Sequence, residues 1–377
     1  MRFNPINAIE EKKERILKTY EELHQLAEPS WKEEKTSAYI QKMLTQAGLD
    51  VKTYDGHFGF IAEIPGESGK VIALRADLDA LMQEVDGVVR ANHSCGHDAH
   101  STMVLFTALT LADFKPSHTM RFIFQPAEEK AGGALQMMKD GALEDVKFLG
   151  GIHLRPAFEI PFGQAAPVIT HGSTASLKGL ITGSAAHASR PENGNNPIDA
   201  AALLIEEIKT IKLSESESYS IKITELHSGE ATNLIPEKAR FTFDLRSASN
   251  ATMTKLIERA QNICKKIATT TGTDIETAIE EHSPAAVESE TAIDAAKTAI
   301  VTILGEKNFI PVCNSPGAED FHFYTWKNPD IAGTMIGLGC DLKPGLHHPK
   351  MKFSKEALIY GTKILTQMLL EADTKQW

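Results

Sequence analysis

The stretch Val71-Ile-Ala-Leu-Arg-Ala-Asp-Leu-Asp79 begins as an apolar strand and ends in charged residues. Because side chains alternate along a strand, Asp77 and Asp79 are expected to point the same way. α/β proteins concentrate functional groups at the carboxyl ends of their strands, and a carboxylate is the usual partner of a metal-bound histidine. The stretch therefore predicts an α/β sheet with chemistry at this edge, with a simple capped turn as the alternative.

The segments on both sides of this stretch alternate between helical and strand-like patterns. Helical spacing is found at residues 8–27, 33–48, 101–112, 131–140, 291–304 and 355–371. Apolar runs that are typical of buried strands occur at residues 59–64, 71–74, 120–124, 148–152, 309–312 and 331–336, with a hairpin-type break at 65–69. Strands that alternate with helices predict an α/β sheet whose two faces are covered.

The middle third of the chain has a different order of elements. The pattern there predicts strand, helix, strand, strand, helix and strand at residues 175–182, 197–212, 219–227, 239–245, 251–270 and 274–280. This βαββαβ order is the split arrangement of a ferredoxin-like α+β domain. We therefore expect one domain built from residues 1–172 and 284–377, with a satellite domain inserted at residues 173–283.

The composition of the 377-residue chain narrows the classes of function. Its net charge of −11 disfavours nucleic acid and anionic membranes as partners, since both are bound by clustered Lys and Arg. No apolar run approaches a membrane span and no signal-peptide core is seen, so a cytoplasmic location is expected. The four cysteines are too few and too widely spaced for a disulfide framework. A small-molecule substrate is the default expectation.

The densest cluster of chemically active residues is Asn92-His-Ser-Cys-Gly-His-Asp-Ala-His100, which contains a thiol, three imidazoles and a carboxylate. Gly96 separates Cys95 from His97, and its freedom at positive φ allows both side chains to face one point. The pattern favours a metal site, while a polar loop with capping histidines is the alternative.

Three further segments carry residues of the same kind. An apolar strand at residues 122–124 continues through a proline into Glu128 and Glu129, where one carboxylate can bind a cation while the other moves a proton. His153 closes another apolar strand, and a histidine pair at residues 347–348 lies in a loop bounded by glycine and prolines. Each segment is weak evidence alone, but together with the cluster they offer ligands for two divalent metals.

The satellite segment contains three more candidates. His187 lies in a loop of small residues that permits close approach, and Asn233 and Arg246 lie in the same predicted domain. Considered alone, each is explained better by ordinary turn or surface chemistry.

The chain nevertheless resembles a known family over nearly its full length, satellite insertion included. The resemblance rests on the motifs Arg75–Asp79, Cys95–His100, Gln125–Glu129, Ile152-His153, Gly317–Phe321 and Leu346–Pro349, which occur in the family's order. The family is that of the metal-dependent aminoacylase-like amidohydrolases, which includes hippurate hydrolases, N-acetyl-diaminopimelate deacetylases and auxin-conjugate hydrolases. It forms the cysteine-ligand branch of the dinuclear metallopeptidases. The resemblance implies a zinc-peptidase-like catalytic domain with a mixed central sheet, and a satellite that acts as a lid or dimerisation domain.

The resemblance also implies roles for individual residues. It implies two divalent metal ions, of Zn, Mn, Co or Ni, with ligands Cys95, His97, Glu129, His153 and His347, of which Cys95 bridges. It implies that Glu128 is the catalytic glutamate, that Asp79 and Glu319 support the site, that His187 contacts the substrate carbonyl, and that Asn233 and Arg246 hold the substrate's carboxylate. Within the 92–100 cluster, Asp98 and His100 are then expected to be supporting residues and His93 a surface residue.

The implied reaction is hydrolysis of the amide bond of a small N-acyl amino acid. A metal-activated water attacks the acyl carbon, and Glu128 serves first as general base and then as general acid. Two departures from the family, at residues 26–29 and 190–196, lie outside the metal set. The chemistry is therefore more strongly indicated than the substrate.

Two other interpretations remain open. In the first interpretation, Cys95 is a nucleophile activated by His97 or His100, as in thiol hydrolases. The second is a non-catalytic relative that binds a ligand without turnover, although such a protein has no need for both Glu128 and Glu129. The sequence also leaves room for a homodimer formed through the satellite domain, with His187 acting in either subunit.

Overall fold

Two units with separate cores make up the computed structural model, which describes residues 5–213 and 218–377. The first unit comprises Met1–Thr170, Val287–Ser315 and Glu319–Trp377, and the second comprises His171–Ala286 with Pro316–Ala318. The predicted insertion limits, residues 173–283, fall inside the second unit. Among the described residues, no helix has the length and apolar character needed to cross a membrane.

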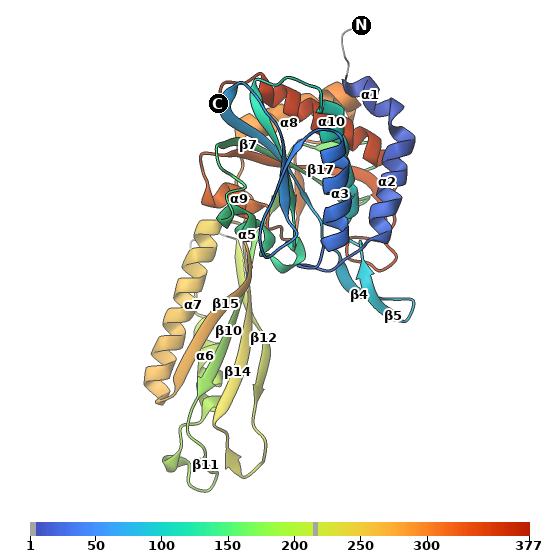
Figure 1. Ribbon diagram of the computed structural model, residues 1–377. Coiled ribbons are helices and arrows are strands. Elements are labelled where there is room, and N and C mark those ends of the chain that lie inside the picture. The colour runs from blue at the N-terminus through green and yellow to red at the C-terminus, as the bar shows by residue number, and fades with distance from the viewer. Residues whose placement is uncertain (1–4, 214–217) are drawn as a thin grey trace. The chain divides into compact units, whose positions relative to one another are not determined.

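A seven-stranded mixed sheet in the order β1-β2-β6-β3-β7-β17-β8 forms the centre of the first unit (Figure 1). Its strands are β1 (Asp50–Thr53), β2 (Phe60–Ile64), β3 (Ser68–Asp77), β6 (His118–Gln125), β7 (Val146–Pro156), β8 (Ala165–Ala166) and β17 (Ala332–Leu342). The four middle strands, from β6 to β17, are parallel, while β1, β2 and β8 run antiparallel to their neighbours. The predicted α/β class with a mixed central sheet is confirmed.

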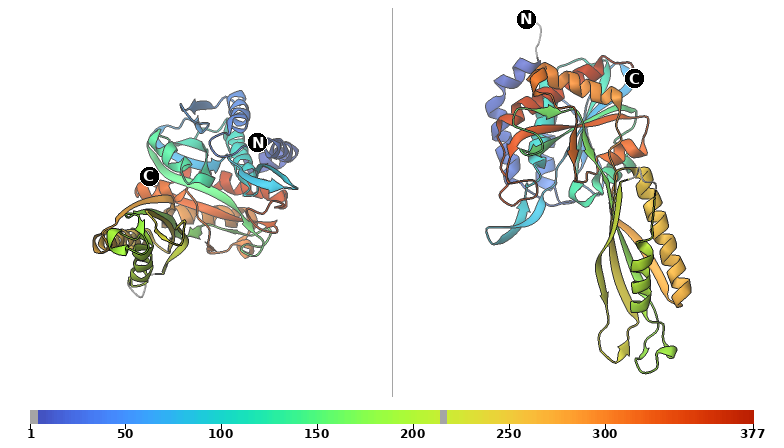
Figure 2. Two further views of the ribbon diagram at one scale, coloured as in Figure 1. Left: turned by 90° about the horizontal axis from the view of Figure 1, so that it is seen from below. Right: turned by 180° about the vertical axis from the view of Figure 1, so that it is seen from behind.

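Helices cover both faces of this sheet, which explains why its four parallel strands are buried at most positions. Ile72 and Leu74 of β3 pack into one hydrophobic cluster, and Val71 and Ala73 pack into another. The helices of the first cluster are α1 (Pro5–Glu11), α2 (Lys13–Gln25), α3 (Glu34–Gln46), α4 (His97–Leu111), α8 (Glu290–Leu304) and α10 (Glu356–Asp373). Those of the second are α5 (Gly133–Lys139) and α9 (His322–Lys327). The right-hand view of Figure 2 shows α8 in orange and α10 in red on this unit.

Some local predictions for the first unit were wrong. Residues 65–69 do not close a hairpin between β2 and β3, because β6 lies between these strands and pairs with both. Only Phe309 of the predicted strand at 309–312 forms a bridge, to Ala165. The structure adds a hairpin that was not predicted, made of β4 (Leu81–Val85) and β5 (Val88–Asn92).

The second unit has the predicted βαββαβ order. Its elements are β10 (Ser173–Thr182), α6 (Pro197–Ile208), β12 (Tyr219–Ser228), β14 (Lys238–Ser247), α7 (Asn250–Thr271) and β15 (Asp274–Ser283). The strands form an antiparallel sheet in the order β12-β14-β10-β15. Phe241 and Phe243 belong to the core under α6 and α7, whereas Arg240 on the alternate face is exposed. Because Thr174 pairs with Ser283, the chain enters and leaves this unit on neighbouring strands.

Candidate metal and catalytic site

The candidate residues of the first unit gather at the carboxyl ends of its parallel strands. Asp77 of β3 pairs with Gln125 of β6, and Arg75 pairs with Gly151 of β7, which brings Asp79, Glu128 and His153 to one edge of the sheet. Cys95 and His97 join them from either side of Gly96, which has φ 91° and directly precedes α4. His347 comes from the loop that follows β17.

These side chains lie at distances that suit metal ligation. Cys95 Sγ lies 3.6 Å from His153 Nε2, and His347 Nε2 lies 3.3 Å from Glu129 Oε1. One group of ligand atoms within 4.8 Å of one another comprises Cys95, His97 and His153, and a second comprises Cys95, Glu129 and His347. Cys95 is the member common to both groups.

Two buried polar atoms in this cluster lack a hydrogen-bond partner among the described residues. They are His97 Nε2 and Glu129 Oε1, which lie 3.9 Å apart. A buried group left without a partner costs about 1–3 kcal/mol, so such groups are rare unless something else satisfies them. A divalent cation held by thiolate, imidazole and carboxylate satisfies both atoms. The residues present therefore fit a metal.

Asp79 organises the site. His97 Nδ1 lies 2.9 Å from the Asp79 carbonyl and 3.1 Å from Asp79 Oδ1. Since both of these oxygens are acceptors, Nδ1 carries the proton and the lone pair of His97 Nε2 is free to bind a metal. Asp79 Oδ1 and Oδ2 also accept from the backbone N–H groups of Glu128 and Glu129, each at 3.1 Å. One carboxylate thus orients a metal ligand and the two glutamates together.

Glu33 supports the same turn, and the sequence offered no signal for it beyond its position before a helix. Its carboxylate is fully buried, and Oε1 accepts from the backbone N–H groups of Ala127 (2.9 Å) and Trp31 (2.8 Å). Ala127 has φ 49°, a left-handed conformation that is uncommon for a residue with a side chain. Burial raises the pKa of Glu33 to about 7. Glu33 therefore holds the residue before Glu128 in a strained conformation.

Arg75 forms a buried charge network beside the site. Its guanidinium donates to Asp77 (2.6 Å) and Asp320 (2.8 Å), and it lies 3.1 Å from Glu319. The structure therefore places Glu319 next to Arg75, and Glu319, Asp320 and Glu128 offer oxygens within 4.8 Å of one another. Burial and the charges of Glu319 and Glu129 raise the pKa of Glu128 well above its ordinary value. Glu128 is thus placed to hold a proton.

The environment of Cys95 disfavours a thiolate in the absence of a metal. Burial raises the pKa of the Cys95 thiol to about 12. Burial also lowers the pKa of His153, whose Nε2 lies 3.6 Å from the Cys95 sulfur, well below its ordinary value. The pKa of His97 is raised despite its burial, because the charges of Asp77 and Cys95 favour its protonated form. An ion pair of Cys95 with His153 is therefore unfavourable, and a thiol nucleophile here would depend on His97.

The remaining ionisable residues of the 92–100 cluster, His93, Asp98 and His100, are buried. The prediction that His93 lies at the surface was wrong, because its side chain is only 2% exposed. Asp98 accepts from His24 Nδ1 at 2.6 Å. His100 accepts from the backbone N–H of Leu154 and donates through Nδ1 to Asp77 (2.9 Å), so it ties α4 to β3 and β7.

The three satellite candidates are exposed, and they lie in two separate parts of the second unit. His187 lies in β11 (Ala186–His187), which pairs with β13 (Leu234–Ile235), and Asn233 accepts from the backbone N–H of Ala188 at 3.0 Å. Arg246 lies near the other end of β14, paired with Asp244. The eight residue steps from Lys238 to Arg246 span about 26 Å of strand. Within one chain, the structure does not bring Arg246 together with His187 and Asn233.

The chain is similar to known proteins over most of its length. A model of peptidase family M20/M25/M40 matches residues 73–371. An N-acetylcysteine deacetylase of Bacillus subtilis is 30% identical, with 94% of this chain and 96% of that protein covered. An N-acetyldiaminopimelate deacetylase of Streptococcus thermophilus is 27% identical over 94% of this chain and 97% of its own.

The chain is also similar to solved structures over nearly its full length. A Bacillus subtilis protein described as a dinuclear metal-binding peptidase of the M20 family superimposes with a TM-score of 0.82 at 27% identity, covering 97% of this chain and 99% of its own. A structure from methicillin-resistant Staphylococcus aureus has a TM-score of 0.88 at 24% identity, with 98% and 99% coverage, and supports the fold alone.

Proposed function

The chain belongs to peptidase family M20/M25/M40, and from this premise we propose that it is a metal-dependent amidohydrolase of small N-acyl amino acids. The observation that carries the proposal is the pair of ligand groups that share Cys95 and lie beside a separate carboxylate, Glu128. Relatives named for deacetylation of N-acetylcysteine and N-acetyldiaminopimelate support this class of substrate.

We assign two divalent cations of Zn, Mn, Co or Ni to these groups. Cys95, His97 and His153 would hold one, and Cys95, Glu129 and His347 would hold the other, with Cys95 belonging to both sets. When bound, the ions supply Lewis acidity, which makes water a nucleophile near neutral pH and stabilises negative charge on the acyl oxygen. Asp79 keeps His97 in the tautomer that ligation needs and holds the backbone of both Glu128 and Glu129.

Glu128 is the proposed proton carrier. Its backbone is held by Asp79 and by the turn that Glu33 supports, so its carboxylate is fixed relative to the ligand groups. Its raised pKa suits a group that takes a proton from the attacking water and returns it to the leaving nitrogen.

The satellite residues are proposed to complete the substrate site in a homodimer. We assign His187 to the acyl carbonyl, and Asn233 and Arg246 to the substrate's carboxylate. Because about 26 Å of strand separates Arg246 from the other two, a small N-acyl amino acid cannot reach all three on one satellite. Two satellites, one from each subunit, are then required.

The expected cytoplasmic location remains a prediction.

The two alternatives are less well supported. A thiol hydrolase needs a reactive Cys95, and burial raises the pKa of Cys95 to about 12. A non-catalytic binding protein has no use for a protonatable Glu128 beside the ligand groups.

The decisive experiment is an activity screen of protein reconstituted separately with Zn, Mn, Co and Ni. The panel contains N-acetyl, N-benzoyl and longer acyl amino acids, with N-acetylcysteine and N-acetyldiaminopimelate included. We expect hydrolysis that a chelator abolishes and that metal restores. Activity that survives the chelator would support the thiol hydrolase, and failure to cleave any substrate with every metal would support the binding protein.

A further inference from the structure

A cavity lies beside the His347 loop, outside the proposed metal groups. It has a volume of 360 Å³ and is lined by the β4–β5 hairpin, by His93 and Ser94, and by residues 349–352. The backbone N–H of His347 donates to the Ser94 carbonyl at 2.8 Å, so one residue of the cavity wall is bonded to a proposed metal ligand. Cavities of about 300–1,000 Å³ are of the size that binds small molecules.

The inner wall of the cavity contains unused hydrogen-bonding groups. His93 is buried, and neither of its ring nitrogens has a partner among residues 5–213 and 218–377; the same is true of the Ser94 hydroxyl. Neighbouring groups are already engaged, since His24 bonds Asp98, and the Asn92 amide donates to Gln83 and Pro349. Buried imidazole and hydroxyl groups are normally satisfied, so these two residues of the cavity lining still lack the partner that a bound group would supply.

The outer wall is cationic, although the chain as a whole carries a net charge of −11. Arg90, Lys350 and Lys352 line the cavity, and the single carboxylate in the lining is Asp86. Asp86 lies 3.2 Å from Lys350, and both side chains are well exposed. Within the part of the chain that the structure describes, Arg90 and Lys352 have no ion-pair partner. The lining therefore offers donors and uncompensated positive charge.

We propose that this cavity binds a small molecule through an oxyanion group, either a phosphate or a carboxylate. His93 and Ser94 donate hydrogen bonds to the oxyanion from inside, and Arg90 and Lys352 supply charge from outside. This proposal is independent of the proposed reaction, because it uses none of the residues assigned to the metals or to proton transfer.

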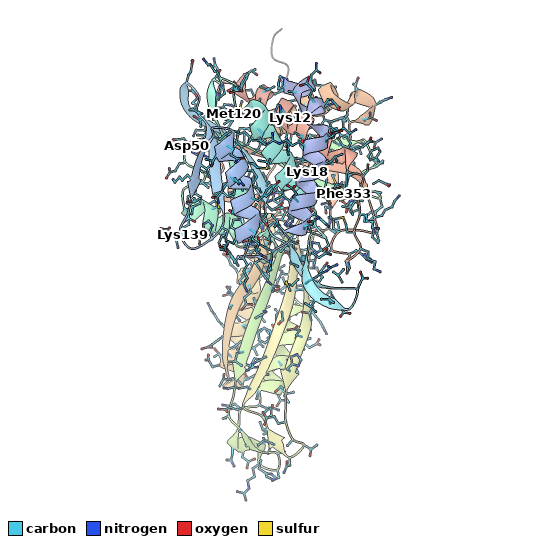
Figure 3. All side chains as sticks on the ribbon, turned by 45° about the vertical axis from the view of Figure 1, so that its right-hand side comes forward. Lys12, Lys18, Asp50, Met120, Lys139 and Phe353 are labelled. Atoms are coloured by element: carbon cyan, nitrogen blue, oxygen red, sulfur yellow. The ribbon has the colours of Figure 1, made fainter. Side chains whose placement is uncertain are left out.

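Binding has a structural consequence for the adjacent loop. Lys343 and Lys352 form a two-way backbone pair that closes the segment containing His347 (2.9 and 2.8 Å). Phe353, labelled in Figure 3, follows directly and packs edge-on against Tyr20. The Gln83 amide on the hairpin donates to the His347 carbonyl at 2.7 Å. An anion between Arg90 and Lys352 would therefore join the hairpin to the His347 segment from a second side.

The test follows histidine side-chain resonances of the zinc-loaded, full-length protein by NMR. Inorganic phosphate and acetate are added in separate titrations at constant ionic strength, with chloride as the reference anion. We expect the His93 resonance, assigned by its loss in His93→Gln, to shift with saturation, and the tighter of the two anions identifies the ligand chemistry.

Two exposed substitutions test the cationic wall without disturbing the core. Arg90→Ala and Lys352→Ala should each raise the Kd about fivefold, and the double variant should raise it more. Lys307→Ala, which removes an exposed lysine elsewhere, should leave the Kd unchanged. The proposal is overturned if His93 does not respond to either anion up to about 10 mM, if only His97, His153 and His347 respond, or if the double variant binds like the unmodified protein.

Discussion

The two units hold their candidate functional side chains in opposite ways. In the first unit, Asp79, His97 and Glu319 are buried and bonded to one another or to Arg75. In the second unit, His187 and Asn233 are exposed on a short two-stranded ribbon. Buried ionisable groups have a fixed geometry but must be compensated, whereas exposed groups cost little and gain precise positions only when a partner or substrate contacts them.

The difference implies that substitutions should separate stability from activity. Changes in the buried network should affect both, and changes on the satellite should affect activity alone. The four predictions below test this separation, beginning with the largest expected effect.

Glu128→Gln should lower kcat about 10³–10⁴-fold, because a carboxamide cannot carry the proton. The metal content, measured by elemental analysis, should stay the same, since Glu129 and the other proposed ligands are unchanged. Glu237→Gln, an exposed glutamate of the satellite, is the matched control and should retain full activity. Near-normal turnover by Glu128→Gln would refute its assignment as the proton carrier.

Arg75→Met should destabilise the first unit by about 3–5 kcal/mol, because three buried carboxylates lose their shared cation. Urea unfolding followed by tryptophan fluorescence measures this unit alone, since Trp31, Trp326 and Trp377 all belong to it.

The matched satellite substitution is Arg246→Met, which breaks an exposed ion pair and should cost less than about 0.5 kcal/mol. Alkylation of Cys264, a buried thiol of the satellite, reports unfolding of that unit. Equal losses of stability in the two variants would contradict the proposed difference between the units.

His187→Ala should reduce kcat about 100-fold, the effect expected for loss of one group that stabilises a developing oxyanion. Its unfolding free energy should be unchanged within about 0.5 kcal/mol because the side chain is exposed. In mixtures of His187→Ala with Glu128→Gln, recovery of activity would show that one subunit's His187 serves the other's site. A stability loss as large as that of Arg75→Met would show that His187 is structural.

Acid should destabilise the first unit through His322. Burial, assisted by the charge of Arg75, lowers the pKa of His322 to about 3, whereas the unfolded chain binds this proton near pH 6.5. Stability is therefore complete above pH 6.5 and falls as the pH drops toward 3. Between pH 6.5 and pH 5 the loss is about 2 kcal/mol. Urea titrations at both pH values should show a smaller loss in His322→Gln, and an identical loss in both proteins would exclude this cause.

The sequence predicts the local features of the fold well. Apolar runs that alternate with helical segments predict the α/β sheet. The local patterns in residues 175–280 predict the βαββαβ order of the satellite. The wrong hairpin between β2 and β3 has a clear cause, because β6, which separates them, lies some fifty residues further along the chain. Strand order depends on long-range pairing, which a local pattern does not contain.

The candidate site shows the same limit. Cys95, His97 and Glu128 stand out because they lie in dense motifs with little else to explain them. Glu33 does not stand out, since a glutamate before a helix is usually exposed, and only the structure shows it buried under Ala127. The separation of Arg246 from His187 is likewise a matter of strand register rather than of motif.

The position of β17 has a consequence for the newly synthesised chain. This strand fills the gap between β7 and β8, yet residues 157–331 separate it from β7. At about 5–20 residues per second, the ribosome takes about ten to thirty-five seconds to make that interval. During that time β7 presents an apolar strand whose outer edge has no partner, which is a template for aggregation. The satellite can complete its own sheet in the same interval, so the need for a chaperone falls on β7 and lasts until β17 emerges.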